Sequence, residues 1–239
     1  MPDSDELAFW EKRWRDYLAD PEQNTATKWD WSPTDDAVLE ALLAAAGPDI
    51  AGLRILEVGS GTAKVSSCLA KKGARVTMVD AAPSALTLGR RLFHSLGLTG
   101  EFVQADMASL PFESAAFDLV WNSGVIRLVK PGGHFVTINP NARCLLYRVT
   151  MYHAAQSGGA GILEVPAVSL REELSRLGLE VTAEYPAAFV SSTIFFAGLP
   201  GAAPLARLIA EWYGQLPPEE RAFFPGYLLV TVGRQPGGP

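Results

Sequence analysis

The sequence predicts an α/β fold with a central, mostly parallel sheet of seven strands and helices on both faces. From about residue 53, short apolar runs alternate with amphipathic stretches, as repeated strand–helix units require. The chain has 239 residues, of which 48% are hydrophobic and 19% charged, so it can bury a large interior. That length fits one domain better than two. We therefore expect a domain over 51–239, preceded by a helical extension over 1–50.

Two helices are predicted in the extension. Apolar residues at helical spacing behind an acidic first turn indicate an amphipathic helix over 4–19. Ser32-Pro33 starts a second helix, and Gly47-Pro48 ends it. The extension is rich in aromatic side chains, which would form a lid over a ligand or pack on the sheet edge. Packing is favoured for Trp10 and Trp14, whereas Trp29 and Trp31 are pocket candidates because a loop is expected there.

The elements of the main domain follow in order. Strands are predicted at 54–58, 75–80, 101–105, 117–121 and 134–138, with helices from the loop after the first strand to Gly73 and over 83–96. Residues 142–155 have helical spacing as well. Ser169 and Glu172 form a capping-box pattern that opens a helix ending at Gly178. Strands at 179–185 and 227–233 and a helix at 203–215 complete the expected order.

A glycine-rich loop follows the first strand. Gly59 and Gly61 lack side chains where the backbone must turn sharply, and they let a ligand approach the peptide groups. The helix after the loop would point free N–H groups and the positive end of its dipole toward a carboxylate or phosphate. Ligands of open parallel sheets bind beyond the carboxyl ends of the strands, so the loop predicts one part of a binding site.

An acidic residue, Asp80, ends the second strand, about 20 residues past the glycines. A carboxylate at this position can accept hydrogen bonds from a ribose diol. The alternative is a turn or cap residue ahead of Pro83. A dinucleotide site is disfavoured because Lys64 stands where Gly-x-Gly-x-x-Gly needs its third glycine, and the phosphate-binding pattern Gly-x-x-x-x-Gly-Lys-Ser/Thr does not occur.

Five segments in order resemble the motifs of the class I S-adenosylmethionine-dependent methyltransferases. They are residues 55–62, 79–80, 104–107 with 110–112 after them, 117–122, and the turn at 130–133. The similarity extends from about residue 53 to 140. It implies the Rossmann-like fold of that family, with S-adenosylmethionine as the cofactor.

The resemblance also implies roles for the residues around the glycine loop. Gly59, Ser60 and Gly61 would contact the methionine part of the cofactor. Asp80 would bind the ribose hydroxyls, and Ala81, the next residue, belongs to the same cofactor-binding set.

Four further residues are assigned by the same resemblance. Asp106 would bind the adenine amino group, unless it only caps the end of the third strand, and Met107 would lie against the adenine face. Asn122 would line the pocket near the methionine end. Glu57 would support the loop through hydrogen bonds to backbone or water, or serve a purely structural purpose.

No catalytic residue is assigned. Methyl transfer from a sulfonium is a direct displacement, so alignment and exclusion of water are the main tasks and a general base is optional. Tyr147, Tyr152, His153 and His134 are the candidates for such a base, but a lone His or Tyr is more often structural.

The connection between the fourth and fifth strands departs from the family pattern. About 11 residues separate Trp121 from Gly133, close to the minimum of roughly 10 to 12 for a parallel crossover that includes a helix. Without that helix one face of the sheet loses its cover. Residues 142–155 would replace it, through Leu145, Val149 and Tyr152 among others, or the chain is shortened at this point. In either case, substrate contacts normally made there are missing.

Composition limits the partners. The formal net charge is −6, with 20 basic and 26 acidic residues, and no basic face for nucleic acid is evident. Cys68 and Cys144 match no disulfide framework or metal-ligand spacing and are expected to be buried thiols. A secretory signal is not recognised, and no segment approaches the roughly 18 apolar residues of a membrane span. We expect a cytoplasmic protein without metal or membrane partner.

The predicted function is methyl transfer from S-adenosylmethionine to an oxygen, nitrogen or carbon of a small molecule, which releases S-adenosylhomocysteine. Two alternatives stay open. The short crossover is compatible with a non-catalytic cofactor-binding or interaction protein, and the fold would also suit an RNA or protein methyltransferase. The sequence contains no acceptor-specific motif such as Asn-Pro-Pro-Tyr, so it identifies neither the acceptor nor the oligomeric state.

Overall fold

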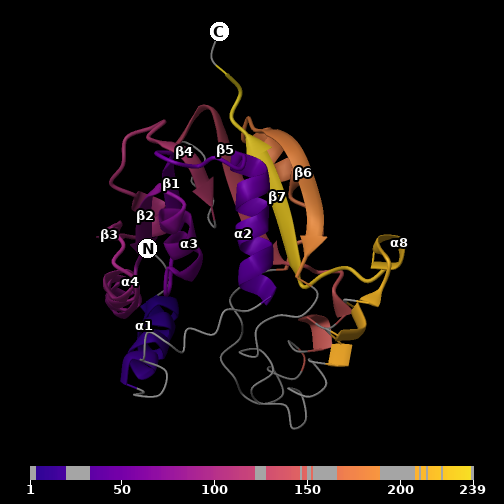
Figure 1. Cartoon of the computed structure of the whole chain (residues 1–239), viewed down its shortest axis with the longest axis horizontal. Coiled ribbons are helices and arrows are strands. Elements are labelled where there is room, and N and C mark those ends of the chain that lie inside the picture. Colours follow the sequence, from indigo (N-terminus) through magenta and orange to yellow (C-terminus); the bar gives the residue numbers. More distant parts are fainter. Residues whose placement is uncertain are drawn as a thin grey trace.

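The structure, a computed structural model, describes residues 4–19, 33–121, 128–149 except 146, 152, 166–188, and 208–237 except 210, 214 and 222. One sheet contains seven strands in the order β3-β2-β1-β4-β5-β7-β6 (Figure 1). The strands are β1 (Arg54–Val58), β2 (Arg75–Asp80), β3 (Glu101–Gln104), β4 (Phe117–Trp121), β5 (Val129–Pro140), β6 (Glu180–Ala187) and β7 (Leu228–Arg234). Strands β1 to β5 are parallel, and β7 pairs antiparallel with both β5 and β6. The predicted mostly parallel sheet is confirmed.

The helices are α1 (Ser4–Ala19), α2 (Pro33–Ala46), α3 (Lys64–Lys71), α4 (Pro83–Ser95), the short 3-10 helix η1 (Met107–Ser109), α6 (Arg171–Arg176) and α8 (Pro218–Arg221). The first four helices begin and end close to the predicted positions, whereas η1 and α8 were not predicted. Pro83 occupies the first turn of α4, where a missing N–H is harmless. Much of the helices predicted over 142–155 and 203–215 lies outside the described residues. Among the described residues, no helix is both long enough and apolar enough to cross a membrane.

One face of the sheet is covered by α2, α3 and α4. Buried side chains from β1, β2 and β4 on this face pack against apolar residues of the three helices, and Leu42, Leu69 and Phe93 represent α2, α3 and α4 in that core. Cys144 is buried in the same core, whereas Cys68 on α3 is only half-buried, so the prediction of two buried thiols is correct for Cys144 alone. Figure 1 shows α2 and α3 in front of the strands.

The other face has a thinner cover. Leu56 and Val120 on this face are fully buried, together with Phe135 of β5. Leu110, Leu128 and Leu174 cover them, from the segment before β4, the segment before β5, and α6. The expectation that residues 142–155 would do so is wrong for the residues described. Leu145, Val149 and Tyr152 are exposed, and Tyr147 packs in the core of the opposite face, because nearby loops already fill the space.

Strand β5 begins earlier than predicted. The Lys-Pro-Gly-Gly segment, expected to be a turn, lies inside the strand, where the register with β4 shifts between Phe117 and Leu119. Gly133 permits this irregularity, because a Cβ there would stand 2.6 Å from the carbonyl oxygen of Asp118. The connection from β4 to β5 thus comprises only residues 122–128, of which 122–127 lie outside the described residues.

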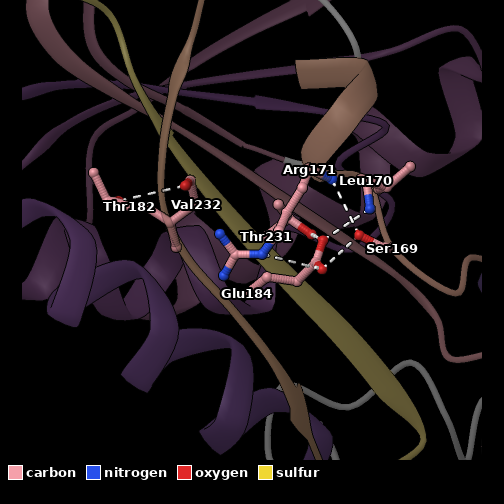
Figure 2. Close-up of polar contacts among 7 residues, drawn as sticks. All are labelled: Ser169, Leu170, Arg171, Thr182, Glu184, Thr231 and Val232. Carbon is pink, nitrogen blue, oxygen red and sulfur yellow. Dashed lines mark hydrogen bonds and ion pairs between the residues drawn. The ribbon is translucent and has the colours of Figure 1, made fainter. Parts of the chain in front are cut away.

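Glu184 on β6 fastens α6 to the sheet, as Figure 2 shows. Its Oε1 accepts a hydrogen bond from Ser169 Oγ at 2.7 Å, and its Oε2 accepts from the Leu170 N–H at 2.8 Å and from Thr231 Oγ1 at 2.9 Å. Burial would raise the pKa of Glu184, but these hydrogen bonds and the charge of Arg171 outweigh it and lower the pKa. The carboxylate therefore joins β6, β7 and the start of α6.

The predicted capping box at α6 is wrong. Glu172 does not reach back to Ser169 but bonds Arg176 one turn ahead, and Ser169 Oγ accepts from the N–H of Arg171 at 3.3 Å. Two observations explain this: Ser169 Oγ donates to Glu184, a residue far along the chain, and α6 begins at Arg171 with Leu170 as its N-cap, one residue later than the pattern requires.

Candidate active site at the carboxyl edge of the sheet

The predicted site residues gather at the carboxyl edge of three neighbouring strands. The glycine loop follows β1, Asp80 ends β2, and Asp106 follows β3. The strand order reverses between β1 and β4, which is where open α/β sheets form ligand-binding crevices. Asn122, expected to complete the site after β4, lies outside the described residues.

The glycine loop turns sharply back onto β2. Gly59 and Gly61 have φ angles of 74° and 49°, in the left-handed region that glycine adopts without strain. The N–H groups of Gly59 and Ser60 both donate to the carbonyl oxygen of Val79, at 2.8 and 2.9 Å. These two N–H groups hold the turn on the end of β2, so the predicted free N–H groups of the helix after the loop would have to come from the first turn of α3.

Asp80 ties the loop to the start of α4. Its Oδ2 accepts from the Gly61 N–H at 2.8 Å, and its Oδ1 accepts from the Ala82 N–H at 2.9 Å. Burial raises the pKa of Asp80, and the nearby Glu11 carboxylate adds to the rise, although the backbone hydrogen bonds oppose it. Each carboxylate oxygen can accept more than one hydrogen bond, so these contacts do not exhaust Asp80 as an acceptor.

Beyond β3, Asp106 acts as the cap of η1. Its Oδ1 accepts from the Ala108 N–H at 2.9 Å, so the capping interpretation of this residue is correct, and a ligand contact would be additional. Met107 beside it is 53% exposed. Ala81 accepts a hydrogen bond on its carbonyl oxygen from Gln104 Nε2 at 3.3 Å, which links the ends of β2 and β3.

Glu57 lies beneath the loop and is 4% exposed. Its Oε2 accepts a hydrogen bond from Ser66 Oγ in α3. Burial raises the pKa of Glu57 to about 8; the bond from Ser66 opposes the rise, and Asp80 and Asp35 add to it. The side chain is therefore uncharged at neutral pH, and it connects the end of β1 to α3.

Two buried polar atoms near Glu57 lack a hydrogen-bond partner. Ser60 Oγ and Trp121 Nε1 are bonded to none of the described groups, although the two residues are only 6% and 4% exposed. Leaving such a group unsatisfied costs about 1–3 kcal/mol. Trp121 is the register partner of Glu57, so both atoms belong to residues at the ends of β1 and β4, on the two sides of the switch point. Sequence reasoning missed Trp121 because an aromatic residue in a buried strand normally indicates core.

Helix α1 lies across the loop and the start of α4 (Figure 1). Glu11 accepts hydrogen bonds from the N–H of Ser84, at 3.1 Å, and from its hydroxyl, at 2.5 Å. Trp14 contacts Gly61, and Trp10 stacks on Trp14 at 6.2 Å between ring centroids. Trp14 thus packs on the proposed cofactor loop and not on a sheet strand, in the position of the lid considered from the sequence.

The role of Glu11 was missed, although its spacing of three residues from Trp14 places both on one helix face. Trp29 and Trp31, the two other aromatic candidates, lie outside the described residues. Lys64, which replaces the third glycine of a dinucleotide loop, forms an ion pair with Asp35 of α2 at 3.0 Å.

Three of the four candidate bases are among the described residues, and the contacts found for them are with residues outside the glycine loop, Asp80 and Asp106. Tyr147 is buried and packs edge-to-face on Tyr227, with 5.2 Å between centroids. Tyr152 is 70% exposed. His134 pairs in register with Leu119 and Arg234, and burial together with the charge of Arg234 lowers its pKa. His153 lies outside the described residues.

Residues 55–144 match a protein-family model described as a methyltransferase domain. The demethylmenaquinone methyltransferase of Clavibacter sepedonicus is 36% identical over 101 residues, which cover 36% of this chain and 41% of that protein. The fatty-acid O-methyltransferase of Mycolicibacterium smegmatis is 34% identical over 115 residues, 41% of each chain. The chain therefore matches about two fifths of the length of these curated relatives.

The likeness in structure extends over more of the chain. A SAM-dependent methyltransferase from Aquifex aeolicus has a TM-score of 0.53 at 13% identity, and the alignment covers 94% of this chain and 97% of that one. Residues 55–144 therefore match a methyltransferase domain, and the chain shares the fold of that solved methyltransferase.

Proposed function

We propose that this protein binds S-adenosylmethionine at the carboxyl edge of β1, β2 and β3 and transfers its methyl group to a small molecule. The observation that carries the proposal is the convergence of the glycine loop, Asp80 and Asp106 on one edge, beside the switch point of the sheet. In this assignment Asp80 binds the ribose hydroxyls. Asp106 binds the adenine amino group, and the exposed Met107 side chain lies against the ring.

The residues around Glu57 fit the methionine end of the cofactor. Ser60 Oγ and Trp121 Nε1 are buried hydrogen-bond donors without partners, and a carboxylate offers two oxygens that could accept from them. Glu57 is uncharged at neutral pH because its pKa is raised to about 8, so it would not repel that carboxylate. Apart from its chain neighbours, no atom of the described residues lies within 4 Å of the position that a Cβ on Gly59 would take, so the backbone there is open to a ligand.

The remaining task of the chain is to align the reactants and exclude water. When bound, the cofactor supplies a methyl group on a sulfonium, and the acceptor displaces the sulfur. Trp14 and Glu11 hold α1 over the loop, where the helix would shield the site from solvent. A small acceptor is favoured over nucleic acid by the net charge of −6. The names of the relatives, a quinone-precursor and a fatty-acid methyltransferase, point to the same class.

Calorimetry with S-adenosylmethionine and S-adenosylhomocysteine tests cofactor binding. We expect both to bind, and Asp80→Ala to weaken binding by about tenfold or more, since a ribose diol would lose a charged acceptor. Asp36→Ala, which removes an acidic residue on α2 outside the site, is the matched control. Absence of binding by either compound at millimolar concentration would contradict the proposal.

Turnover is a separate question. Transfer of labelled methyl groups to phenolic, quinol and fatty-acid acceptors should release S-adenosylhomocysteine in equal amounts. The alternative is a non-catalytic cofactor-binding protein, which the short connection over residues 122–128 favours. Binding of the cofactor without turnover on any of these acceptors would support it.

A further inference from the structure

A hollow of about 730 Å³ opens at the amino edge of the sheet. The first residues of β1, β2 and β3, which are Arg54, Arg75 and Glu101, line it together with the turns that precede β2 and β3. Figure 1 shows α1 near the opposite, carboxyl ends of these strands, and none of the residues assigned to the cofactor lines the hollow. Its volume is within the range of roughly 300–1,000 Å³ that is usual for small-molecule sites.

The hollow has an excess of positive charge. Arg54 and Arg75 are register partners on neighbouring strands, which lie about 4.8 Å apart, so their side chains leave the same face of the sheet. Like charges placed opposite each other in this way are destabilising. Neither guanidinium forms an ion pair with a described residue. An anion between them would relieve the repulsion.

The nearby carboxylates already have partners. Asp118 accepts from Lys130 Nζ at 2.9 Å and from the backbone N–H of Arg54 at 2.8 Å. Glu101 Oε2 accepts from Thr77 Oγ1 at 3.2 Å. Of the charged residues that line the hollow, two are therefore cationic and one is anionic, in a chain with a net charge of −6.

One side of the hollow is aromatic. Phe112 and Phe117 pack edge-to-face with 5.2 Å between ring centroids, and Arg54 Cζ lies 5.4 Å from the centroid of Phe117. This cation–π contact holds the Arg54 guanidinium beside the apolar wall. A ligand that combines a flat apolar body with one negative group would match both parts.

We propose that this hollow is a second binding site, for a small aromatic molecule that carries a carboxylate or a phosphate. The anionic group lies between Arg54 and Arg75, and the ring lies along Phe112, because Phe117 behind it is only 3% exposed. The site does not depend on the proposed cofactor site, because the two share no residue and lie at opposite ends of β1 and β2.

Calorimetry with phenyl phosphate and benzoate tests the proposal. The ligand that binds more tightly identifies the preferred anionic group. Inorganic phosphate and phenol serve as the separate halves of the ligand, and both should bind at least about tenfold more weakly. Arg75→Gln should weaken binding of the better ligand about tenfold, and Arg54→Gln/Arg75→Gln should abolish saturable binding. Arg176→Gln, at an exposed arginine of α6, should leave it unchanged.

Asp80→Ala should bind the better ligand like wild type, which separates this site from the cofactor site. Arg75 is exposed, so its variant is expected to fold even if loss of the Arg54–Phe117 contact unfolds the double variant. The proposal is overturned if neither benzoate nor phenyl phosphate binds at millimolar concentration, or if Arg75→Gln binds as tightly as wild type. Equal binding of phenol or of inorganic phosphate would also overturn it.

Discussion

The indole ring of Trp14 lies so close to Gly61 that a Cβ added to the glycine would stand 3.0 Å from Trp14 Cζ2. The two residues belong to the N-terminal helix and to the loop after β1, and each constrains the other. Gly61 also has a φ of 49°, so an L side chain is disfavoured there on two independent grounds. At Gly59 only the backbone disfavours a side chain. Its φ is 74°, but apart from its chain neighbours no atom of the described residues lies within 4 Å of the position of a Cβ.

Gly61→Ala should therefore be more destabilising than Gly59→Ala. Both variants lose about 1–2 kcal/mol because alanine is forced into the left-handed region. Gly61→Ala loses more, because Trp14 must also move. Urea unfolding of the two variants measures the difference in free energy. Adding Trp14→Ala to each variant should remove that difference. Equal losses in the two single variants would mean that the Trp14 contact contributes nothing to stability.

The Trp121→Phe variant tests whether the indole N–H of Trp121 donates a hydrogen bond to the ligand or whether the side chain is only part of the core. The indole N–H has no partner among the described residues, so a ring that lacks it loses no hydrogen bond, and the smaller ring should cost the ligand-free protein only about 1–2 kcal/mol in the core. Binding of S-adenosylhomocysteine should weaken by about tenfold if the N–H is a ligand donor.

The readout is the melting temperature of each protein with and without S-adenosylhomocysteine. Ser60→Ala should behave in the same way, because Ser60 Oγ is the second unpartnered donor. A Trp121→Phe variant that binds normally but is strongly destabilised would place the residue in the core alone.

Glu57→Gln tests the uncharged state of the buried carboxyl group. Burial raises the pKa of Glu57 from its ordinary value of 4.5 to about 8, so the folded protein binds more protons than the unfolded chain between these pH values. The stability that Glu57 contributes is full below pH 4.5 and falls as pH rises to about 8, by up to about 1.4 kcal/mol per pH unit. Glutamine cannot ionise, so this loss should disappear.

Urea unfolding of wild type and Glu57→Gln at pH 5 and pH 8 checks this expectation. The variant should gain on the order of a few kcal/mol over wild type between the two conditions. Asp80 and Asp35 face Glu57 and titrate in both proteins, so only the difference between the two proteins is attributed to Glu57. Identical pH profiles would show that Glu57 is ionised in the folded protein.

The sequence was sufficient to predict the strands, helices and loop that local sequence patterns determine. Strands β1, β2 and β4 were predicted with their observed bounds, because each is a short apolar run between turn signals. The glycine loop and Asp80 were placed at one edge because parallel strands end on the same side. The N-terminal helices were also predicted, since the helical period of α1 and the Pro and Gly signals of α2 are local.

What failed depended on contacts between distant residues. The capping box at Ser169 satisfied the local rule, but Glu184 of β6 accepts the Ser169 hydroxyl and the Leu170 N–H, and α6 begins one residue later. The Pro-Gly-Gly segment indicated a turn, whereas pairing with β4 draws it into an irregular β5. The sequence also could not predict that Trp121 Nε1 is buried without a hydrogen-bond partner among the described residues, because this depends on how the folded structure packs and leaves no sequence pattern.

Glu184→Gln should loosen α6 from the sheet. The carboxylate accepts hydrogen bonds from Ser169, Leu170 and Thr231, and an amide has only one oxygen to replace its two. We expect a loss of about 2–3 kcal/mol in unfolding free energy, against about 1 kcal/mol for Thr231→Val, which removes a single hydrogen bond.

The pH dependence has the opposite sign to that of Glu57. The pKa of Glu184 is lowered, so its contribution to stability is present above the ordinary value of 4.5 and is lost as pH falls through the folded pKa. The difference between wild type and Glu184→Gln should therefore shrink in acid. Hydrogen exchange of the α6 and β6 amides locates the effect, and unchanged exchange there would contradict the assigned role.

Glu11→Ala should release α1 from the domain. Glu11 is the acceptor for both the N–H and the hydroxyl of Ser84, and α4 has no side-chain cap of its own at Ala82. Hydrogen bonds to a charged group contribute about 1.5–3 kcal/mol, so the population of undocked α1 should rise about tenfold or more. Trypsin reports this population, because Lys12, Arg13 and Arg15 are potential cleavage sites only when the helix opens.

The matched control is Asp16→Ala, which breaks only the exposed pair with Lys12 on the same helix and should change cleavage little. If the two variants are cleaved at the same rate, the contact of Trp14 with Gly61, and not Glu11, holds α1 over the loop.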